Sequence, residues 1–411
     1  MSVLLRAPGM SALLLLLACS SSPAFALGAR AAAAPPRRAA VAPARNLLAN
    51  PGFEKTLSDH EWMPAGWDTS DAGVPTVFFG RDSFMVHSGR AAVNIANTSM
   101  LFPMSHNWNQ TLLVGPETWG KTAVLSFWAR SNGLEGRAYI MLQAYRDSVT
   151  RMSRIWGVDR EQALRRMGIN KINDELMDLG WKRVVFSDPN TDWVRREARV
   201  YIPQSVNVLF VRAGLFGNGQ VLFDDASLTL VSGPPPAAAP LGQNLLADES
   251  FEQGGDGWDF SVPPYEGARL EIDTTVAHTG RASARLSTFH DGLVQARMGI
   301  TQPLAGSTVA GKRVRLTAWV KGDSLGTNAL VKIYAHSPQG LVLQSPGAEL
   351  LSGTFDWTRI AIELDVPKTA VLVWPWVYAN APGVGRVWFD DVRFEALGPS
   401  VTRSPGTPPR R

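Results

Sequence analysis

The sequence is poor in the residues that most often cross-link a chain or perform catalysis, with one cysteine and six histidines among 411 residues. The cysteine, Cys19, lies near the N-terminus, so a chain cleaved beyond it cannot form a disulfide. No HExxH or dinucleotide-binding pattern occurs, and no GxSxG elbow or P-loop stands out, although GDSLG at 322–326 and GPETWGKT at 115–122 match the spacing of those two motifs. We therefore expect a protein without a catalytic constellation.

Long apolar runs and an excess of one charge are also missing. No segment approaches the roughly 20 apolar residues of a transmembrane helix, and 40 basic residues stand against 36 acidic ones. Several arginines belong to two PPRR motifs near the chain ends. No basic surface for nucleic acid is expected from such a distribution.

The first residues nevertheless form a familiar pattern. Arg6 precedes a leucine-rich apolar run, which is followed by the tripeptide AFA. This order predicts a secretory signal peptide at 1–26, and hence a secreted, extracytoplasmic protein. The sequence LLAC, which ends at Cys19, resembles a bacterial lipoprotein signal. A lipid anchor on Cys19 is therefore the alternative.

A series of motifs occurs twice in the same order. NLLANPGFE at 46–54 recurs as NLLADESFE at 244–252. In the same way HSGRAA recurs as HTGRAS, LSFWAR as LTAWVK, DW as DW, and LFDD as WFDD. Repetition of a whole series indicates two copies of one structural module.

The segments between these motifs indicate the class of fold. Short runs of alternating apolar and polar residues, separated by turn residues, predict an all-β chain with two β-sandwich modules in tandem. Between the copies, SGPPPAAAPLGQ has no core-forming pattern and predicts an extended spacer. The expected parts are a signal peptide at 1–26, a disordered linker at 27–45, the first module at 46–231, a linker at 232–243, the second module at 244–398 and a disordered tail at 399–411.

The first copy is the longer one, and its extra sequence has a helical pattern. Asp159 is a candidate N-cap, apolar residues follow at helical spacing, and Gly180 closes the run. We expect a helical insertion at about 151–180. This insertion is also the candidate contact for a protein partner.

The motifs NPGFE, HSGRAA, LSFWAR, DW and LFDD together resemble carbohydrate-binding modules of families 4, 9 and 22. The resemblance covers nearly all of both copies. It implies galactose-binding-like jelly rolls that are not themselves catalytic, that often accompany glycoside hydrolases, and that often hold one structural calcium ion per module. The implied calcium ligands are Glu54 and Asp224 in the first copy and Glu252 and Asp390 in the second, with backbone carbonyls near Gly89 and Gly280.

Aromatic residues found in one copy alone are the candidates for ligand contact. Trp374, Trp376 and Tyr378 alternate along one predicted strand, which places the three rings on one face. The aligned strand of the first copy holds Arg212, and an arginine is rarely buried without a partner, so this face is expected to point outward. Such a row suits the apolar faces of pyranose sugars, whereas a register slip of one residue would bury it.

The remaining candidates follow from position. The other predicted carbohydrate-binding residues are Arg297, Gln295 and Asn380 in the second copy and Arg212 and Trp108 in the first. Tryptophans that recur in both copies are assigned to the fold instead, namely Trp67 and Trp258, Trp128 and Trp319, and Trp193 and Trp357.

The sequence thus predicts a secreted, non-catalytic protein that binds polysaccharide or cell-wall glycan through an aromatic platform on the second module. Two alternatives remain open. A cell-surface scaffold or partner-binding protein would use the segment 151–180. An unrecognised glycoside hydrolase would need two carboxyl groups, for which Glu161, Asp174 and Glu175 are the candidates.

Overall fold

A computed structural model describes most of the chain after the predicted leader. The described residues are 45–70, 75–99, 105–167, 176–261, 268–288, 297–338, 342–346, 350–380 and 384–401. Those from Arg45 onward belong to one compact unit. None of the helices in these ranges has the length and apolar content of a membrane span.

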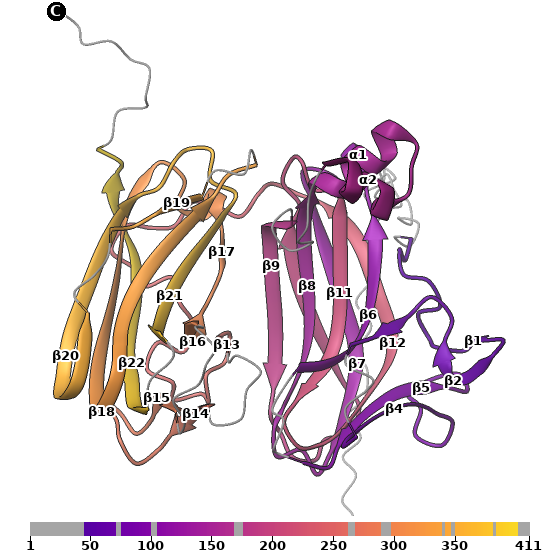
Figure 1. Ribbon diagram of the computed structural model, residues 1–411, viewed down its shortest axis with the longest axis horizontal. Helices are drawn as coiled ribbons and strands as arrows, with labels where there is room; N and C mark the ends of the chain where they lie inside the picture. Colours follow the sequence, from indigo (N-terminus) through magenta and orange to yellow (C-terminus); the bar gives the residue numbers. More distant parts are fainter. Residues whose placement is uncertain are drawn as a thin grey trace, which may run out of the picture. The chain divides into compact units, whose positions relative to one another are not determined.

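The first half of the unit is built mainly from strands. They are β1 (Thr56–Leu57), β2 (His60–Pro64), β3 (Asp68–Thr69), β4 (Val77–Asp82), β5 (Ala92–Asn97), β6 (Ser105–Leu113), β7 (Lys121–Asn132), β8 (Arg137–Asp147), β9 (Leu176–Phe186), β10 (Val194–Tyr201), β11 (Val208–Phe216) and β12 (Gly219–Ser232), with a 3-10 turn η1 (Pro116–Thr118). One sheet has the order β10-β7-β12-β5-β4 and the other β3-β6-β11-β8-β9, while β1 pairs with β2. The two five-stranded sheets pack face to face (Figure 1).

The side chains between these two sheets form the first core. Alternate residues of β7, such as Leu125, Phe127 and Ala129, point into it, and Ile140 and Leu142 of β8 meet them from the other sheet. This arrangement follows from the period of two in a strand, which sends every second side chain to the same face. We call the part of the chain that surrounds this core the first module.

Two short helices lie at one end of the first module (Figure 1). Helix α1 (Ser148–Trp156) begins after Asp147, whose carboxylate accepts hydrogen bonds from the Val149 and Thr150 N–H groups, and α2 (Arg160–Met167) follows. The carboxylate of Asp159 accepts a hydrogen bond from the N–H of Gln162, in the role predicted for this N-cap.

The predicted helical pattern fails at its end. Residues 176–180 belong to β9, because β9 pairs with β8 over its whole length. A bulge between the Ala144 and Tyr145 pairs disturbs the alternation, so that Leu179 points into the core and Trp181 away from it. The apolar residues around the bulge are therefore irregularly spaced in the sequence, and their spacing resembles that of a helix.

The second half of the unit has the strands β13 (Asp259–Ser261), β14 (Ala268–Asp273), β15 (Ser283–Thr288), β16 (Arg297–Thr301), β17 (Leu304–Ala305), β18 (Lys312–His336), β19 (Val342–Gln344), β20 (Leu351–Asp365), β21 (Leu372–Asn380) and β22 (Gly385–Pro399), with a 3-10 turn η3 (Gly306–Thr308). They form one sheet of order β13-β16-β21-β18-β22-β15-β14, with β17 beside β21 and β19 and β20 beside β18. Strand β18 connects the two layers: its first half pairs with β20 and β22, and its second half pairs with β21.

The two layers enclose a second core. Its members include Phe251, Trp258, Leu316 and Phe389, and we call the part of the chain around it the second module. The predicted all-β fold with two sandwiches in tandem is confirmed. In the first module β7 and β8 are separate strands, whereas the single strand β18 takes their place in the second module.

Candidate functional site

The three predicted platform residues lie on one side of β21, a strand that pairs with β16 on one side and β18 on the other. Val373, Val377 and Ala379 point into the second core, so the alternate side chains point away from it. We call this side the outer face of the second module.

On the outer face the rings form a continuous row. The centroids of Trp374 and Trp376 are 6.4 Å apart, and those of Trp376 and Tyr378 are 5.9 Å apart. Tyr334 of β18 lies opposite Trp374 in the register and adds a fourth ring, which the sequence did not single out. Gly299 of β16 leaves room for Tyr378, because a Cβ there would collide with that side chain.

The row is not equally accessible along its length. Trp374 is 9% exposed and Tyr378 is 3% exposed, whereas Trp376 is half-buried. Trp374 packs against Trp181 of β9, with ring centroids 5.5 Å apart, and both belong to one apolar cluster with Tyr139, Met141 and Leu372. The row that the sequence predicts to be exposed is therefore nearly buried at Trp374 and at Tyr378, and of the three rings only Trp376 is partly accessible.

The polar candidates of the second module are only partly described. Arg297 begins β16, where its backbone pairs with Asn380. Its side chain and the whole of Gln295 lie outside the described residues. Asn380 is half-buried at the end of β21, next to the aromatic row.

The corresponding sheet of the first module presents a different outer face. Arg212 of β11 lies on it, with its guanidinium 4.3 Å from the centroid of the Phe210 ring. Tyr139 of β8 lies over Gly214, where a Cβ would collide with its ring, and its hydroxyl is 2.5 Å from Ser105 Oγ. The outer face of the first module thus carries Arg137, Arg183 and Arg212 among its rings, where β21 of the second module carries an aromatic row.

Trp108 requires a correction. Its side chain is fully buried in the first core, and its indole N–H donates to the Asn94 carbonyl at 3.0 Å. The alternation of β6 points Trp108 inward, while its neighbours Asn107 and Asn109 occupy the outer positions. Trp108 is therefore a core residue and does not reach a ligand surface.

The residues predicted to bind calcium form a hydrogen-bonded arrangement that is the same in both modules. In the first, the buried carboxylate of Asp224 accepts hydrogen bonds from the N–H groups of His87, Ser88 and Asp225 at 2.8, 3.1 and 2.7 Å. Glu54 accepts from the Arg90 N–H at 2.7 Å. In the second, Asp390 accepts from His278, Thr279 and Asp391 at 2.7, 3.1 and 2.7 Å, and Glu252 from Arg281 and Ala282 at 2.6 and 2.9 Å.

The second aspartate of each pair completes the arrangement. Asp225 lies 2.6 Å from the Nδ1 atom of His87, whose ring stacks on Trp128 with centroids 4.0 Å apart. Asp391, His278 and Trp319 repeat this geometry at 2.6 and 4.0 Å. We call each set a clasp: Glu54, 87–90 and Asp224–Asp225 in the first module, and Glu252, 278–281 and Asp390–Asp391 in the second.

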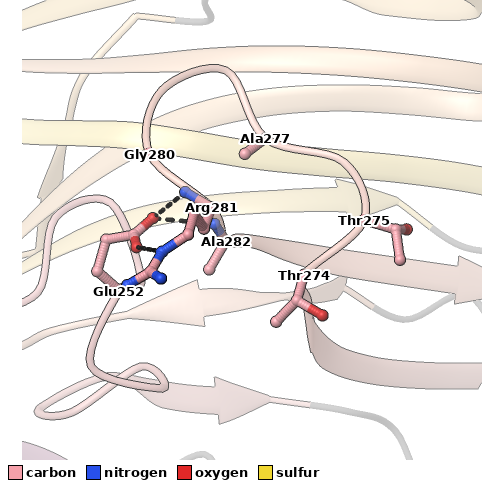
Figure 2. Close-up of a pocket in the computed structure, with 7 residues that line it drawn as sticks. All are labelled: Glu252, Thr274, Thr275, Ala277, Gly280, Arg281 and Ala282. Atoms are coloured by element: carbon pink, nitrogen blue, oxygen red, sulfur yellow. Dashed lines mark hydrogen bonds and ion pairs between the residues drawn. The ribbon is translucent and has the colours of Figure 1, made fainter.

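Figure 2 shows the glutamate of the second clasp, with its carboxylate directed at the backbone after Gly280. Gly280 has a φ of 67°, and a Cβ there would collide with the Glu252 carboxylate. A pocket of about 590 Å³ lies beside this turn, lined by Glu252, Thr274, Thr275, Ala277, Gly280, Arg281 and Ala282. None of these described lining residues is aromatic, so they offer a sugar no stacking surface.

In the arrangement observed, calcium would have to share the aspartate oxygens of each clasp with backbone N–H groups, and its binding stays a prediction. Calcium takes six to eight oxygen ligands, but both oxygens of Asp224 already accept N–H groups, and so do those of Asp390. In the described part of the chain no three His, Cys, Asp or Glu side chains converge as metal ligands. Burial raises the pKa of Asp224, and it raises that of Asp390 to about 6.

Two further predictions concern the helical segment. Asp174 and Glu175 and the side chain of Glu161 lie outside the described residues, so the structure does not test a carboxylate pair there. Ile155 on α1 is 61% exposed. The protein partner expected at 151–180 stays a prediction.

Comparison with known proteins gives a likeness in fold. No family model matches the chain. An uncharacterized HTH-type transcriptional regulator, YbfP of Bacillus subtilis strain 168, is 29% identical over 157 residues, which are 38% of this chain and 52% of that protein. The chain thus spans about half the length of this curated relative.

Several solved carbohydrate-binding modules are similar in structure. The tandem CBM22 domain of Xyn10C from Paenibacillus barcinonensis matches 88% of this chain and 100% of its own, with 14% identity and a TM-score of 0.31. The C-terminal family 22 module of Xyn10B from Clostridium thermocellum matches 41% of this chain and 100% of its own, with 18% identity and a TM-score of 0.31. At these identities and scores the likeness says nothing about a ligand.

Proposed function

We propose that this protein is a secreted, non-catalytic polysaccharide-binding protein, and that a glycan chain stacks on Trp374, Trp376 and Tyr378. The observation that carries the proposal is the continuous row of rings on the outer face of β21. Pyranose rings present apolar C–H faces that stack on indole and phenol rings, while their hydroxyl groups stay hydrogen-bonded. Rings about 6 Å apart can contact successive parts of one chain.

The polar neighbours of the row support the same use. Lys332 of β18 lies beside Trp376 in the register, and Asn380 follows Tyr378 on the same strand. Both side chains are half-buried. Hydroxyl groups of a stacked sugar need such donors and acceptors, because a few polar groups on an apolar surface orient a ligand.

The test is affinity electrophoresis of the purified protein through gels that contain soluble xylan, glucomannan or mixed-linkage β-glucan. We expect one or more of these polymers to retard the wild type. Trp376→Ala should lower the affinity roughly 30-fold, since truncation of a central aromatic anchor costs about 2 kcal/mol.

The matched control is Trp357→Ala, which removes another half-buried tryptophan of the second module. Trp357 lies against His278 of the clasp, with centroids 5.5 Å apart, and not on the outer face. Equal retardation of the wild type and Trp376→Ala would contradict the platform. Retardation of none of the proteins by any polymer would contradict polysaccharide binding by the protein as purified.

A further inference from the structure

The cover over Trp374 comes from the first module, and it decides how a glycan reaches the platform. Trp181 is 8% exposed and its ring is inclined at 53° to that of Trp374. Neither ring belongs to the core of its own module, since both lie in a separate cluster with Tyr139, Met141 and Leu372. The two outer faces therefore bury their aromatic rings against each other.

Polar contacts surround this aromatic cluster. Arg183 of β9 forms an ion pair with Asp259 of β13, and both side chains are nearly buried. The Arg137 guanidinium lies 3.8 Å from the centroid of the Phe260 ring. Arg146 donates to the Pro338 carbonyl at 2.7 Å. The contact thus joins specific partners, and a nearly buried ion pair lies beside its rings.

The contact nevertheless leaves buried polar atoms without partners. They include the indole Nε1 of Trp374, Oε1 of Gln143 and Nε of Arg212. Gln143 lies next to Trp181 in the register, and Arg212 lies one row away on the same face. A buried donor or acceptor without a hydrogen bond is unfavourable. Sugar hydroxyl groups could pair with such atoms, whereas the apolar rings opposite them cannot.

Such a contact is suited to opening. Contacts between domains of one chain resemble transient interfaces, so relative motion is the ordinary expectation. The connecting residues 233–238 are exposed throughout and are rich in proline and alanine. They are long enough to let the modules separate by several ångströms while staying linked.

We infer that the first module acts as a cover for the platform of the second, and that a polysaccharide must displace Trp181 from Trp374 to bind. This inference rests on the proposed function and adds how polysaccharide binding at the platform is regulated. In the closed state Trp181 occupies the position that a sugar ring would take on Trp374. The apparent affinity for polysaccharide is then the intrinsic affinity reduced by the fraction of open molecules.

The experiment compares the full protein with Trp181→Ala, which removes a ring of the contact, and with Arg183→Ala, which removes its ion pair with Asp259. Trp193→Ala is the control, because it removes a half-buried tryptophan of the first module that packs on His87 instead. Small-angle scattering reports opening without any ligand. Affinity electrophoresis with soluble xylan, glucomannan and mixed-linkage β-glucan reports binding.

We expect both contact variants to have a larger radius of gyration than the wild type and the control. Their affinity should rise by roughly tenfold, the gain that follows if about a tenth of wild-type molecules are open. The reverse effect should also occur, because thermodynamic linkage is reciprocal. If a xylan, glucomannan or β-glucan polymer retards the wild type, an oligosaccharide of that polymer should increase the radius of gyration of the wild-type protein.

Three results would overturn the inference. If Trp376→Ala loses binding but both contact variants match the wild type in size and affinity, the platform stands and the cover does not. If Trp181→Ala binds more weakly than the wild type, Trp181 belongs to the glycan site and is no cover. If no polymer retards any protein, the proposed function fails, and the inference falls with it.

Discussion

The two modules agree closely in their clasps but differ in their outer faces. The contacts of Asp224 and Asp390 match donor for donor, and the corresponding distances differ by 0.1 Å or less. The outer faces share a sheet position but carry Arg212 in one module and Trp376 in the other. What both modules keep serves the fold, and what only one has is free to serve a ligand.

The physical reason lies in the cost of change. A clasp joins residues that are far apart in the sequence of a module, and its central acceptor, Asp224 or Asp390, is fully buried. Loss of one acceptor leaves several N–H groups unpaired at once. A side chain on an outer face has solvent or a neighbouring module on one side, so its replacement disturbs few other contacts.

The largest expected effect breaks the clasps. Asp224→Ala and Asp390→Ala each remove the acceptor of three N–H groups, and we expect each to lower the free energy of unfolding by about 3 to 5 kcal/mol. The losses should be similar, because the contacts are the same. Urea unfolding followed by circular dichroism measures them.

The control for this comparison is Asp192→Ala, whose side chain is 84% exposed and pairs with Arg130 at the surface. Such surface pairs contribute little, so a change below about 1 kcal/mol is expected. If one clasp variant lost a large part of its free energy of unfolding and the other almost none, the clasps would be alike in geometry but unequal in their contribution to stability.

A smaller effect concerns the protonation of the second clasp. Burial raises the pKa of Asp390 from its ordinary value of 3.8 to about 6. The folded state then holds this proton more tightly than the unfolded state. The stabilisation is complete below about pH 4 and is lost as the pH rises through 6.

We therefore expect the wild type to lose roughly 2 kcal/mol relative to Asp390→Asn between pH 4 and pH 7, because asparagine does not titrate. Urea unfolding at intervals of one pH unit measures the difference. The same comparison for Asp224→Asn should show the same sign, since the pKa of Asp224 is also raised by burial. A wild type that gains stability relative to its variant as the pH rises would contradict the assignment.

The sequence was sufficient to predict what repeats. The doubled motifs predicted two modules of one fold, and the alternation along β21 placed Trp374, Trp376 and Tyr378 on one face, although the exposure expected for Trp374 and Tyr378 was wrong. These inferences succeed because strand geometry has a fixed period and because a repeated motif is compared with itself.

Other features depend on contacts that no local pattern contains. The bulge in β9 gave this strand an apolar spacing that resembles a helix, and Trp181 was not predicted as a contact residue. Trp181 has no counterpart in the second module, so the rule that singled out unpaired aromatic residues also applies to it. Trp108 was placed on the wrong face because the register of β6 was not known. The cover over Trp374 depends on residues almost 200 positions away.

The smallest expected effect is that of calcium, which the resemblance implies and whose predicted aspartate ligands are hydrogen-bonded to backbone N–H groups in this structure. The acceptor atoms of Asp224 and Asp390 are already engaged with N–H groups, so we expect excess EDTA to leave the unfolding midpoint unchanged and added calcium not to raise it. Magnesium at the same concentration is the control for ionic strength.

The opposite result would be equally clear. A ligand that binds only the folded state stabilises it by about 2.7 kcal/mol at 100 times its dissociation constant, so a calcium-dependent rise of the midpoint would show that the turns rearrange around a metal. A bound cation would also favour the ionised form of Asp390 and lower its pKa. The loss of stability between pH 4 and pH 7 would then disappear in calcium, whereas a hydrogen-bonded clasp keeps it with or without the ion.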